Sequence, residues 1–194
     1  MGRGWGRTIY KLGKLTLDSH EQHRDHAKDR TARCAVLTIS DTRIAETDAG
    51  GRAIIDALKQ AGHTVSDYTL VKDEPTQIEA QLNSWLSPPN QPPTTSHQPL
   101  DLIVTTGGTG IASRDTTVEV VRRLLDKELE GFGELFRMLS YEEVGPAAML
   151  SRAVAGLAGQ TLIFTLPGSP NAVKLAMEKL IIPELPHMVW ERGR

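Results

Sequence analysis

The chain has 194 residues and a formal net charge of −2 at pH 7, which predicts one domain with extensions, because single domains usually have about 100–200 residues. A charge so close to neutral gives no electrostatic case for binding nucleic acid or an anionic membrane. There is no run of about 18 apolar residues and no signal-peptide core, so we expect no membrane span and a cytoplasmic protein. Cys34 is the one cysteine, which excludes a disulfide framework, and its apolar surroundings predict a buried side chain rather than a nucleophile.

Residues 1–32 read as an N-terminal extension to a domain that spans residues 33–194. The extension has a modest excess of basic over acidic side chains. His20, His23 and His26 are spaced by three and could share one face of a helix, as a metal site would require. A solvated arm is the alternative that we favour.

Strands are expected to alternate with helices along the domain. Apolar runs and alternating patterns predict strands that include residues 33–41, 63–71, 102–104, 153–158 and 161–166. Apolar residues at helical spacing predict helices at 49–62, from residue 75 onward, and at 117–125, 134–143, 171–180 and 184–190. We expect Gly62 to end the first helix, and Gly131 to Gly133 to break the chain between two later ones.

This alternation predicts an α/β fold of three layers, in which helices cover both faces of a mostly parallel sheet. The loops after residues 40, 71, 105 and 166 should then meet, because the carboxyl ends of parallel strands share one edge of the sheet. Residues 87–99 contain five of the eleven prolines. We expect an exposed loop there, and favour a tolerated insertion over a docking site.

The clearest functional signal is the glycine-rich stretch Gly107–Gly110, which follows an apolar strand and precedes a helix. Glycines let backbone amides approach a ligand, and a helix N-terminus adds unpaired N–H groups and a positive dipole end. We therefore predict a phosphate-binding loop. It is not a P-loop, which needs lysine and a hydroxyl residue after its second glycine, nor a dinucleotide fingerprint, because residues 108–113 lack the third glycine. A tight turn without a ligand is the remaining alternative.

Two acidic residues, Asp73 and Asp115, follow the second strand and the glycine-rich loop. Each comes after a strand end, so both can face the same crevice. Paired carboxylates beside a phosphate site suit Mg²⁺, which prefers a few carboxylates together with phosphate oxygens and water. The alternatives are a helix N-cap for Asp73, and a cap or a partner of Arg114 for Asp115. The matched placement of the two acids favours the metal site.

Three stretches of the chain resemble the MoaB/MogA family of molybdopterin-binding proteins. The sequence TTGGTG with the Arg114-Asp115 pair is similar to the family's signature. Residues 38–48, TISDTRIAETD, resemble its first-strand motif, and residues 166–173, LPGSPNAV, its late proline–glycine turn. The resemblance covers about residues 33–182. The chain departs from the family at Gly50, where serine is common, which predicts the loss of a side-chain cap or ligand contact, and at Ser113, where proline is common.

The resemblance implies the chemistry of the family, which is Mg²⁺-dependent adenylylation of molybdopterin by ATP with release of pyrophosphate. It implies that Asp73 and Asp115 are catalytic and hold the metal. The residues expected to contact molybdopterin or ATP are Ser40, Asp41, Thr106, Gly107, Gly108, Thr109, Gly110, Pro167, Gly168 and Ser169. For Ser40, Asp41 and Ser169, turn or cap chemistry remains an equal alternative.

The resemblance also implies a homo-oligomer, either a trimer or a dimer of trimers. Apolar residues crowd more than one face of the short helix at 134–143, as a subunit interface would require: Leu135, Phe136, Met138 and Leu139. Ordinary core packing is the alternative for these side chains. The alternative function is a non-catalytic molybdopterin-binding or scaffold protein of the same pathway. Retention of both aspartates favours the enzyme.

Overall fold

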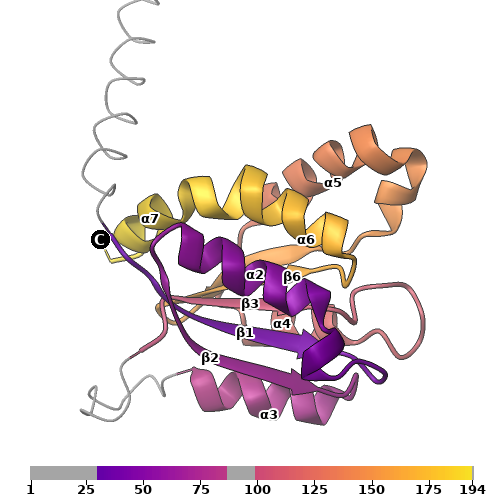
Figure 1. The fold of residues 1–194 in the computed structure, drawn as a ribbon, viewed down its shortest axis with the longest axis horizontal. Coiled ribbons are helices and arrows are strands. Elements are labelled where there is room, and N and C mark those ends of the chain that lie inside the picture. The colour runs from indigo at the N-terminus through magenta and orange to yellow at the C-terminus, as the bar shows by residue number, and fades with distance from the viewer. Residues whose placement is uncertain (1–29, 87–98, 194) are drawn as a thin grey trace, which may run out of the picture.

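A six-stranded sheet lies at the centre of residues 30–86 and 99–193, the part of the chain that the computed structural model describes (Figure 1). Its strands are β1 (Arg33–Ile39), β2 (Thr64–Val71), β3 (Leu102–Thr106), β4 (Lys127–Glu128), β5 (Val154–Ala158) and β6 (Thr161–Leu166). Their order is β2-β1-β3-β6-β5-β4. The first four strands in that order are parallel, whereas β5 is antiparallel to both of its neighbours, β6 and β4. The predicted α/β fold with a mostly parallel sheet is confirmed.

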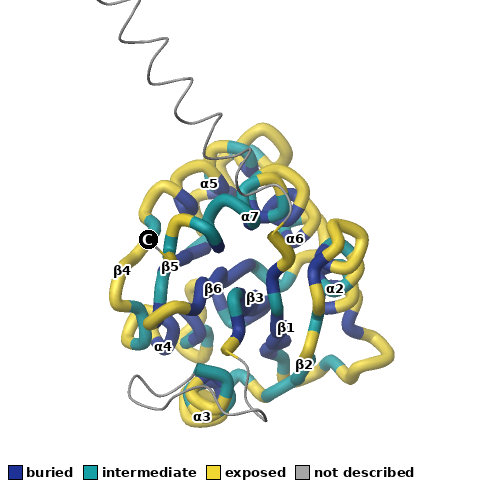
Figure 2. The backbone as a smooth tube through the Cα atoms, turned by 90° about the vertical axis from the view of Figure 1, so that its left-hand side faces the viewer, coloured by how far each residue is buried: buried dark blue, intermediate teal, exposed yellow. Residues whose placement is uncertain are grey.

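Helices cover both faces of the sheet, as predicted (Figure 1). They are η1 (Ala45–Thr47), α2 (Ala49–Gln60), α3 (Pro75–Trp85), α4 (Thr117–Leu124), α5 (Glu130–Val144), η2 (Gly145–Leu150), α6 (Pro170–Ala176), η3 (Met177–Ile181) and α7 (Ile182–Glu191). Successive side chains of β1 point to opposite faces, so Val36 joins the core under α2, α6 and α7, and Leu37 joins the core under α3 and α4. Figure 2 shows the buried central strands β1, β3 and β6, whereas the edge strands β2 and β4 and parts of the surrounding helices are more exposed.

The predicted break at Gly131 and Gly133 is wrong, because α5 begins at Glu130 and runs through both glycines. The chain leaves helical structure earlier, where Lys127 and Glu128 pair as β4 with the edge of β5. A side chain at Gly133 would place its Cβ 2.8 Å from the Ala153 carbonyl. This glycine therefore allows close packing of α5 against the chain before β5 instead of ending the helix.

The two predicted C-terminal helices form one helical run from Pro170 to Glu191. The join is η3, a π-helical turn in which the amide of Ile182 donates to the carbonyl of Met177. Pro183 follows directly and has no N–H to donate, so a regular α-helical ladder cannot pass through this point. The wider turn accommodates the proline without ending the helix.

Residues at the start of the domain pack tightly. Ala32 is buried, and its amide donates to Nδ1 of His63 at 3.2 Å, so ordered packing begins before β1. Cys34 is fully buried, as predicted, and burial raises the pKa of its thiol to about 12. The histidines of the N-terminal extension and the segment 87–98 lie outside the described residues. No helix in the described part of the chain has both the length and the hydropathy needed to cross a bilayer.

Candidate active site

A cavity of about 490 Å³ lies at the carboxyl ends of the parallel strands, where the four predicted loops meet. This volume is within the usual range for small-molecule sites. Ten of the predicted site residues line it: Ser40, Asp41, Asp73, Gly107, Gly108, Thr109, Gly110, Asp115, Pro167 and Gly168. Thr106 and Ser169 are not among the lining residues. The expected meeting of these loops at one edge of the sheet is confirmed.

The glycine-rich loop turns sharply at the end of β3. Gly107 has φ +103°, and a Cβ there would lie 2.1 Å from the Ile39 carbonyl, so only glycine fits. Its own amide donates to the carbonyl of Leu166, which removes one of the four amides expected to bind an anion. Within the described chain, the amides of Gly108, Thr109 and Gly110 have no acceptor, and these three N–H groups remain for a ligand.

Asp73 lies beneath the glycine-rich loop. Its carboxylate oxygens are 2.9 and 3.0 Å from the position that a Cβ would occupy at Gly108. One of them, Oδ1, is buried and has no hydrogen-bond partner among the described residues. Burial and the nearby Asp115 raise the pKa of Asp73. The N-cap interpretation of Asp73 is wrong, because Glu74 is the residue that precedes α3.

Asp115 reaches the same cavity from the other end of the loop. Its Oδ2 accepts a hydrogen bond of 2.9 Å from the amide of Ala112, which closes the turn before α4. Arg114 pairs with Asp41 at 3.3 Å instead, so the alternative in which Arg114 is the partner of Asp115 is wrong. Asp73 and Asp115 both line the cavity, and after burial the negative charge of Asp115 is the next largest cause that raises the pKa of Asp73.

The acidic residues of the cavity fit a magnesium ion whose remaining coordination positions a bound ligand would fill. The described residues contain no cluster of three or more histidine, cysteine or acidic side chains able to hold a metal alone. Mg²⁺ usually takes one or two carboxylates and fills its remaining positions with phosphate oxygens and water. Asp73 and Asp115 would supply that pair, and a cation would satisfy the unpartnered oxygen of Asp73.

Two predicted site residues, Thr106 and Ser40, have structural contacts that explain them in part, whereas Ser169 has no side-chain cap contact. Thr106 is buried below the cavity, and its hydroxyl donates to the Pro167 carbonyl at 3.0 Å, which ties β3 to the loop after β6. The Ser40 hydroxyl lines the cavity but also accepts from the amides of Thr42 and Arg43, as its turn interpretation requires. Ser169 is exposed and precedes α6 without a side-chain cap.

Two arginines of the site were not singled out from the sequence. Arg43 lines the cavity and donates to the Gly168 carbonyl at 2.8 Å. Arg152 donates to the carbonyls of Thr109 and Asp115 at 3.2 and 2.7 Å, which braces the loop that carries Asp115. Arg43 lies within the first-strand motif, close to the strand end, which was an available signal. Arg152 is 37 residues beyond Asp115, and no local sequence pattern predicts its contacts with this loop.

The predicted loss of a cap at Gly50 does not leave α2 uncapped. The Asp48 side chain accepts a 3.0 Å hydrogen bond from the amide of Gly51 and is the N-cap of this helix. A Cβ at Gly50 would lie 3.7 Å from Asp48, from Gly168 and from Thr106, which are ordinary contacts. A Cβ therefore fits at this position, and close packing does not require glycine here.

A family model for a probable molybdopterin binding domain matches residues 35–187. The chain belongs to this molybdopterin-binding family, and the resemblance seen in its three motifs is confirmed. Within the family, it is 52% identical over 173 residues to molybdenum cofactor biosynthesis protein B of Staphylococcus aureus strain MRSA252, covering 88% of this chain and 97% of that protein.

Solved structures agree with this assignment. A crystal structure of molybdenum cofactor biosynthesis protein B matches with a TM-score of 0.77 and 47% identity, over 85% of this chain and 98% of that one. A structure of MogA matches with a TM-score of 0.70 and 30% identity, over 82% and 99% of the two chains. The sheet and its covering helices are those of the MoaB/MogA proteins.

Proposed function

We propose that this protein acts in molybdenum cofactor biosynthesis as a molybdopterin adenylyltransferase that uses ATP and Mg²⁺. In this reaction a terminal phosphate oxygen of molybdopterin attacks the α-phosphorus of ATP, and the bond to the pyrophosphate leaving group breaks. The products are adenylyl-molybdopterin and pyrophosphate. A role in this pathway is supported by the similarity of the chain to proteins named molybdenum cofactor biosynthesis protein B. The transfer chemistry is supported chiefly by the unpartnered carboxylate oxygen of Asp73, which lies near Asp115 and the free loop amides.

The cavity offers what this reaction needs. An anionic nucleophile has to approach an anionic phosphate, so the site has to supply positive charge and alignment. The amides of Gly108, Thr109 and Gly110 can donate to phosphate oxygens, while Asp73 and Asp115 would hold the metal. Bound Mg²⁺ would neutralise charge on the phosphates. A phosphate nucleophile is already ionised, so no general base is required.

The direct test is a transfer assay with the full chain, molybdopterin, ATP and Mg²⁺, in which adenylyl-molybdopterin and pyrophosphate are measured together. We expect both products in equal amounts, and neither after the metal is chelated. Binding of molybdopterin without either product would favour the non-catalytic binding or scaffold protein. Equal product formation with and without a chelator would contradict the metal assignment.

We further propose that the protein is a trimer or a dimer of trimers. On α5, Phe136 is buried in the core, but Leu135 and Met138 are 48% and 56% exposed. Met149 and Leu150 in η2 extend this exposed apolar surface. Apolar surface of this kind often marks a subunit contact. Light scattering should report three or six times the chain mass, and a monomer at micromolar concentration would contradict the proposal.

A further inference from the structure

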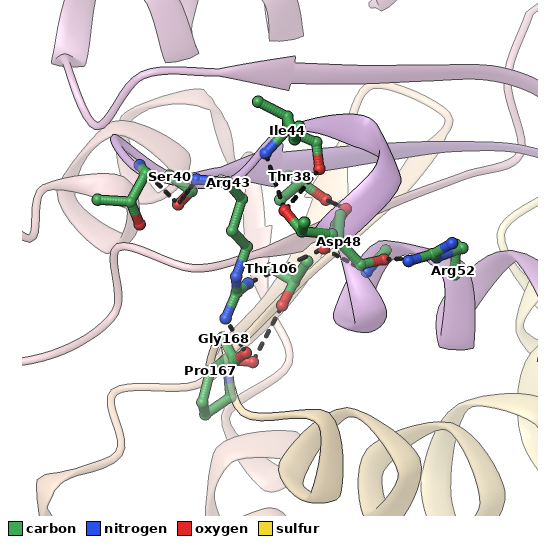
Figure 3. Close-up of polar contacts among 12 residues, drawn as sticks. Thr38, Ser40, Arg43, Ile44, Asp48, Arg52, Thr106, Pro167 and Gly168 are labelled. Carbon is green, nitrogen blue, oxygen red and sulfur yellow. Dashed lines mark hydrogen bonds and ion pairs between the residues drawn. The ribbon is translucent and has the colours of Figure 1, made fainter.

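Arg43 lies in the wall of the cavity, and the proposed reaction assigns no role to its side chain. It follows β1, and its guanidinium reaches across to the loop after β6, where Nη2 donates to the carbonyl of Gly168 at 2.8 Å (Figure 3). Its Nη1 lies 3.9 Å from Oδ1 of Asp48. The side chain is therefore directed by two groups that are far apart in the sequence.

Asp48 is a fixed negative charge behind this arginine. It is fully buried, and its carboxylate accepts hydrogen bonds from Thr38 at 2.6 Å, Tyr68 at 2.7 Å and the amide of Gly51 at 3.0 Å. Burial alone would raise its pKa, but the hydrogen bonds and Arg43 outweigh burial and hold the pKa below its usual value. The carboxylate is ionised at neutral pH, and it orients Arg43 without using all of the guanidinium donors.

Donors on Arg43 remain available to a ligand. A guanidinium has five N–H groups, and among the described residues the Gly168 carbonyl is the one acceptor within hydrogen-bond distance. The side chain is 31% exposed and lines the cavity. Arg114 is the other cation among the described lining residues, but it is 71% exposed and pairs with Asp41. Arg43 is thus the better-ordered positive charge of the cavity.

We propose that Arg43 binds a phosphate group of the ligand, and that Asp48 and the Gly168 carbonyl hold its guanidinium in place for this contact. A planar guanidinium with two or more free donors matches the oxygens of a phosphate, and an arginine that is already ordered loses less conformational entropy on binding. Naming the ligand as ATP or molybdopterin rests on the proposed function. The binding of phosphate by Arg43 does not require that transfer occurs.

The test measures binding of inorganic pyrophosphate to the full chain by calorimetry, for the wild type and for Arg43→Gln, Arg43→Lys and Arg52→Gln. Arg52 is the matched control, because it donates to the backbone carbonyls of Glu46 and Asp48 and is not a lining residue. Figure 3 shows it on the other side of Asp48 from Arg43. We expect Arg43→Gln to weaken binding by about 10-fold or more, as for the loss of a charged hydrogen bond, and Arg52→Gln to leave it unchanged.

The lysine variant separates phosphate binding from a purely structural clamp. Lysine keeps the charge but cannot fork between Gly168 and Asp48 as arginine does. Direct phosphate binding predicts that Arg43→Lys binds pyrophosphate more tightly than Arg43→Gln, whereas a clamp alone predicts equal affinities for the two variants. Equal affinities, or wild-type affinity in well-folded Arg43→Gln, would overturn the proposal.

The result is independent of the transfer assay. If no adenylyl transfer is found but Arg43→Gln still weakens pyrophosphate binding, the phosphate-binding role of Arg43 is supported and the proposed adenylyltransferase activity is contradicted. If transfer is found and Arg43→Gln binds pyrophosphate with wild-type affinity, the adenylyltransferase activity is supported and the proposed role of Arg43 is contradicted. Melting temperatures of the variants show whether each is folded.

Discussion

Two aspartates at the same edge of the sheet differ in how fully their oxygens are used. The carboxylate of Asp48 is fully buried and accepts three hydrogen bonds, which outweigh burial and lower its pKa. The carboxylate of Asp73 has a buried oxygen without a partner among the described residues. Burial and a second negative charge raise the pKa of Asp73.

The difference separates a carboxylate that serves the fold from one that is available to a ligand. A buried polar atom without a partner lowers stability by roughly 1–3 kcal/mol, so native proteins contain few of them. Asp48 ties β1, β2 and the start of α2 together through its hydrogen bonds. Asp73 keeps a buried oxygen without a partner among the described residues, and for this reason the proposed function assigns a cation to it. Substitutions at or beside the two residues should therefore have different effects.

The largest effect should come from Asp73→Asn and Asp115→Asn. Each change is nearly isosteric and removes one negative charge from the proposed metal site, so adenylyl transfer should fall by about 1,000-fold. Molybdopterin affinity should fall far less, because the loss is in transition-state stabilisation. Turnover and affinity are the measurements, and the melting temperature is the control for folding. Unchanged turnover in both folded variants would leave the binding protein as the better hypothesis.

The next largest effect should come from Gly51→Ala, on the Asp48 side of the comparison. A Cβ at Gly51 would lie 2.1 Å from Oδ2 of Asp48 and 2.7 Å from the Thr38 hydroxyl, so it would break their hydrogen bond. We expect a loss of about 3 kcal/mol in the free energy of unfolding, measured by urea denaturation.

Gly50→Ala is the matched control for Gly51→Ala. Its Cβ meets neighbours at 3.7 Å, and replacing glycine in a helix usually stabilises by about 0.5–1 kcal/mol. Equal losses of stability in the two variants would mean that crowding at Asp48 is not the cause.

A smaller and pH-dependent effect is expected for Asp48→Asn. Because the folded state lowers the pKa of Asp48, its ionised form stabilises the protein above the usual aspartate pKa of about 4, and this stability is lost as the pH falls through the folded-state pKa. The variant should be about 2 kcal/mol less stable than the wild type at pH 7, and the gap should narrow below about pH 4. Denaturation at several pH values measures it.

Asp56→Asn is the control for this prediction, since Asp56 is exposed on the same helix. Its effect on stability should be small at every pH. A gap between the wild type and Asp48→Asn that stays constant from pH 7 to below pH 4 would show that hydrogen-bond geometry, and not charge, determines the contribution of Asp48.

The parts of the site that follow a strand directly could be predicted from the sequence. The glycine at position 107 predicts a turn there. Asp73 and Asp115 share a crevice because the carboxyl ends of parallel strands lie at one edge of the sheet. The contact between Arg43 and Gly168 joins residues 125 positions apart, so no local pattern reveals it.

The missed features of the fold also depend on distant partners. The two glycines at the start of α5 predict a helix break when the sequence is considered alone. In the structure, Gly133 instead allows the chain before β5 to pack closely against the helix. The two residues of β4 are too few to give an alternating pattern, and they become a strand through their pairing with β5. Sequence periodicity describes one element at a time, whereas these features are set by the element on the other side of the contact.

Cys34 makes the opening of the core between the sheet and its covering helices measurable by thiol chemistry. It is the one cysteine of the chain, lies in β1 between β2 and β3, and is fully buried with a thiol pKa of about 12. The cysteine thiolate attacks alkylating reagents, and Cys34 lies in the core beneath the helices that cover one face of the sheet, so it can react only when this core opens. The rate of labelling therefore reports how often this core opens, and a ligand that binds the folded state should slow it.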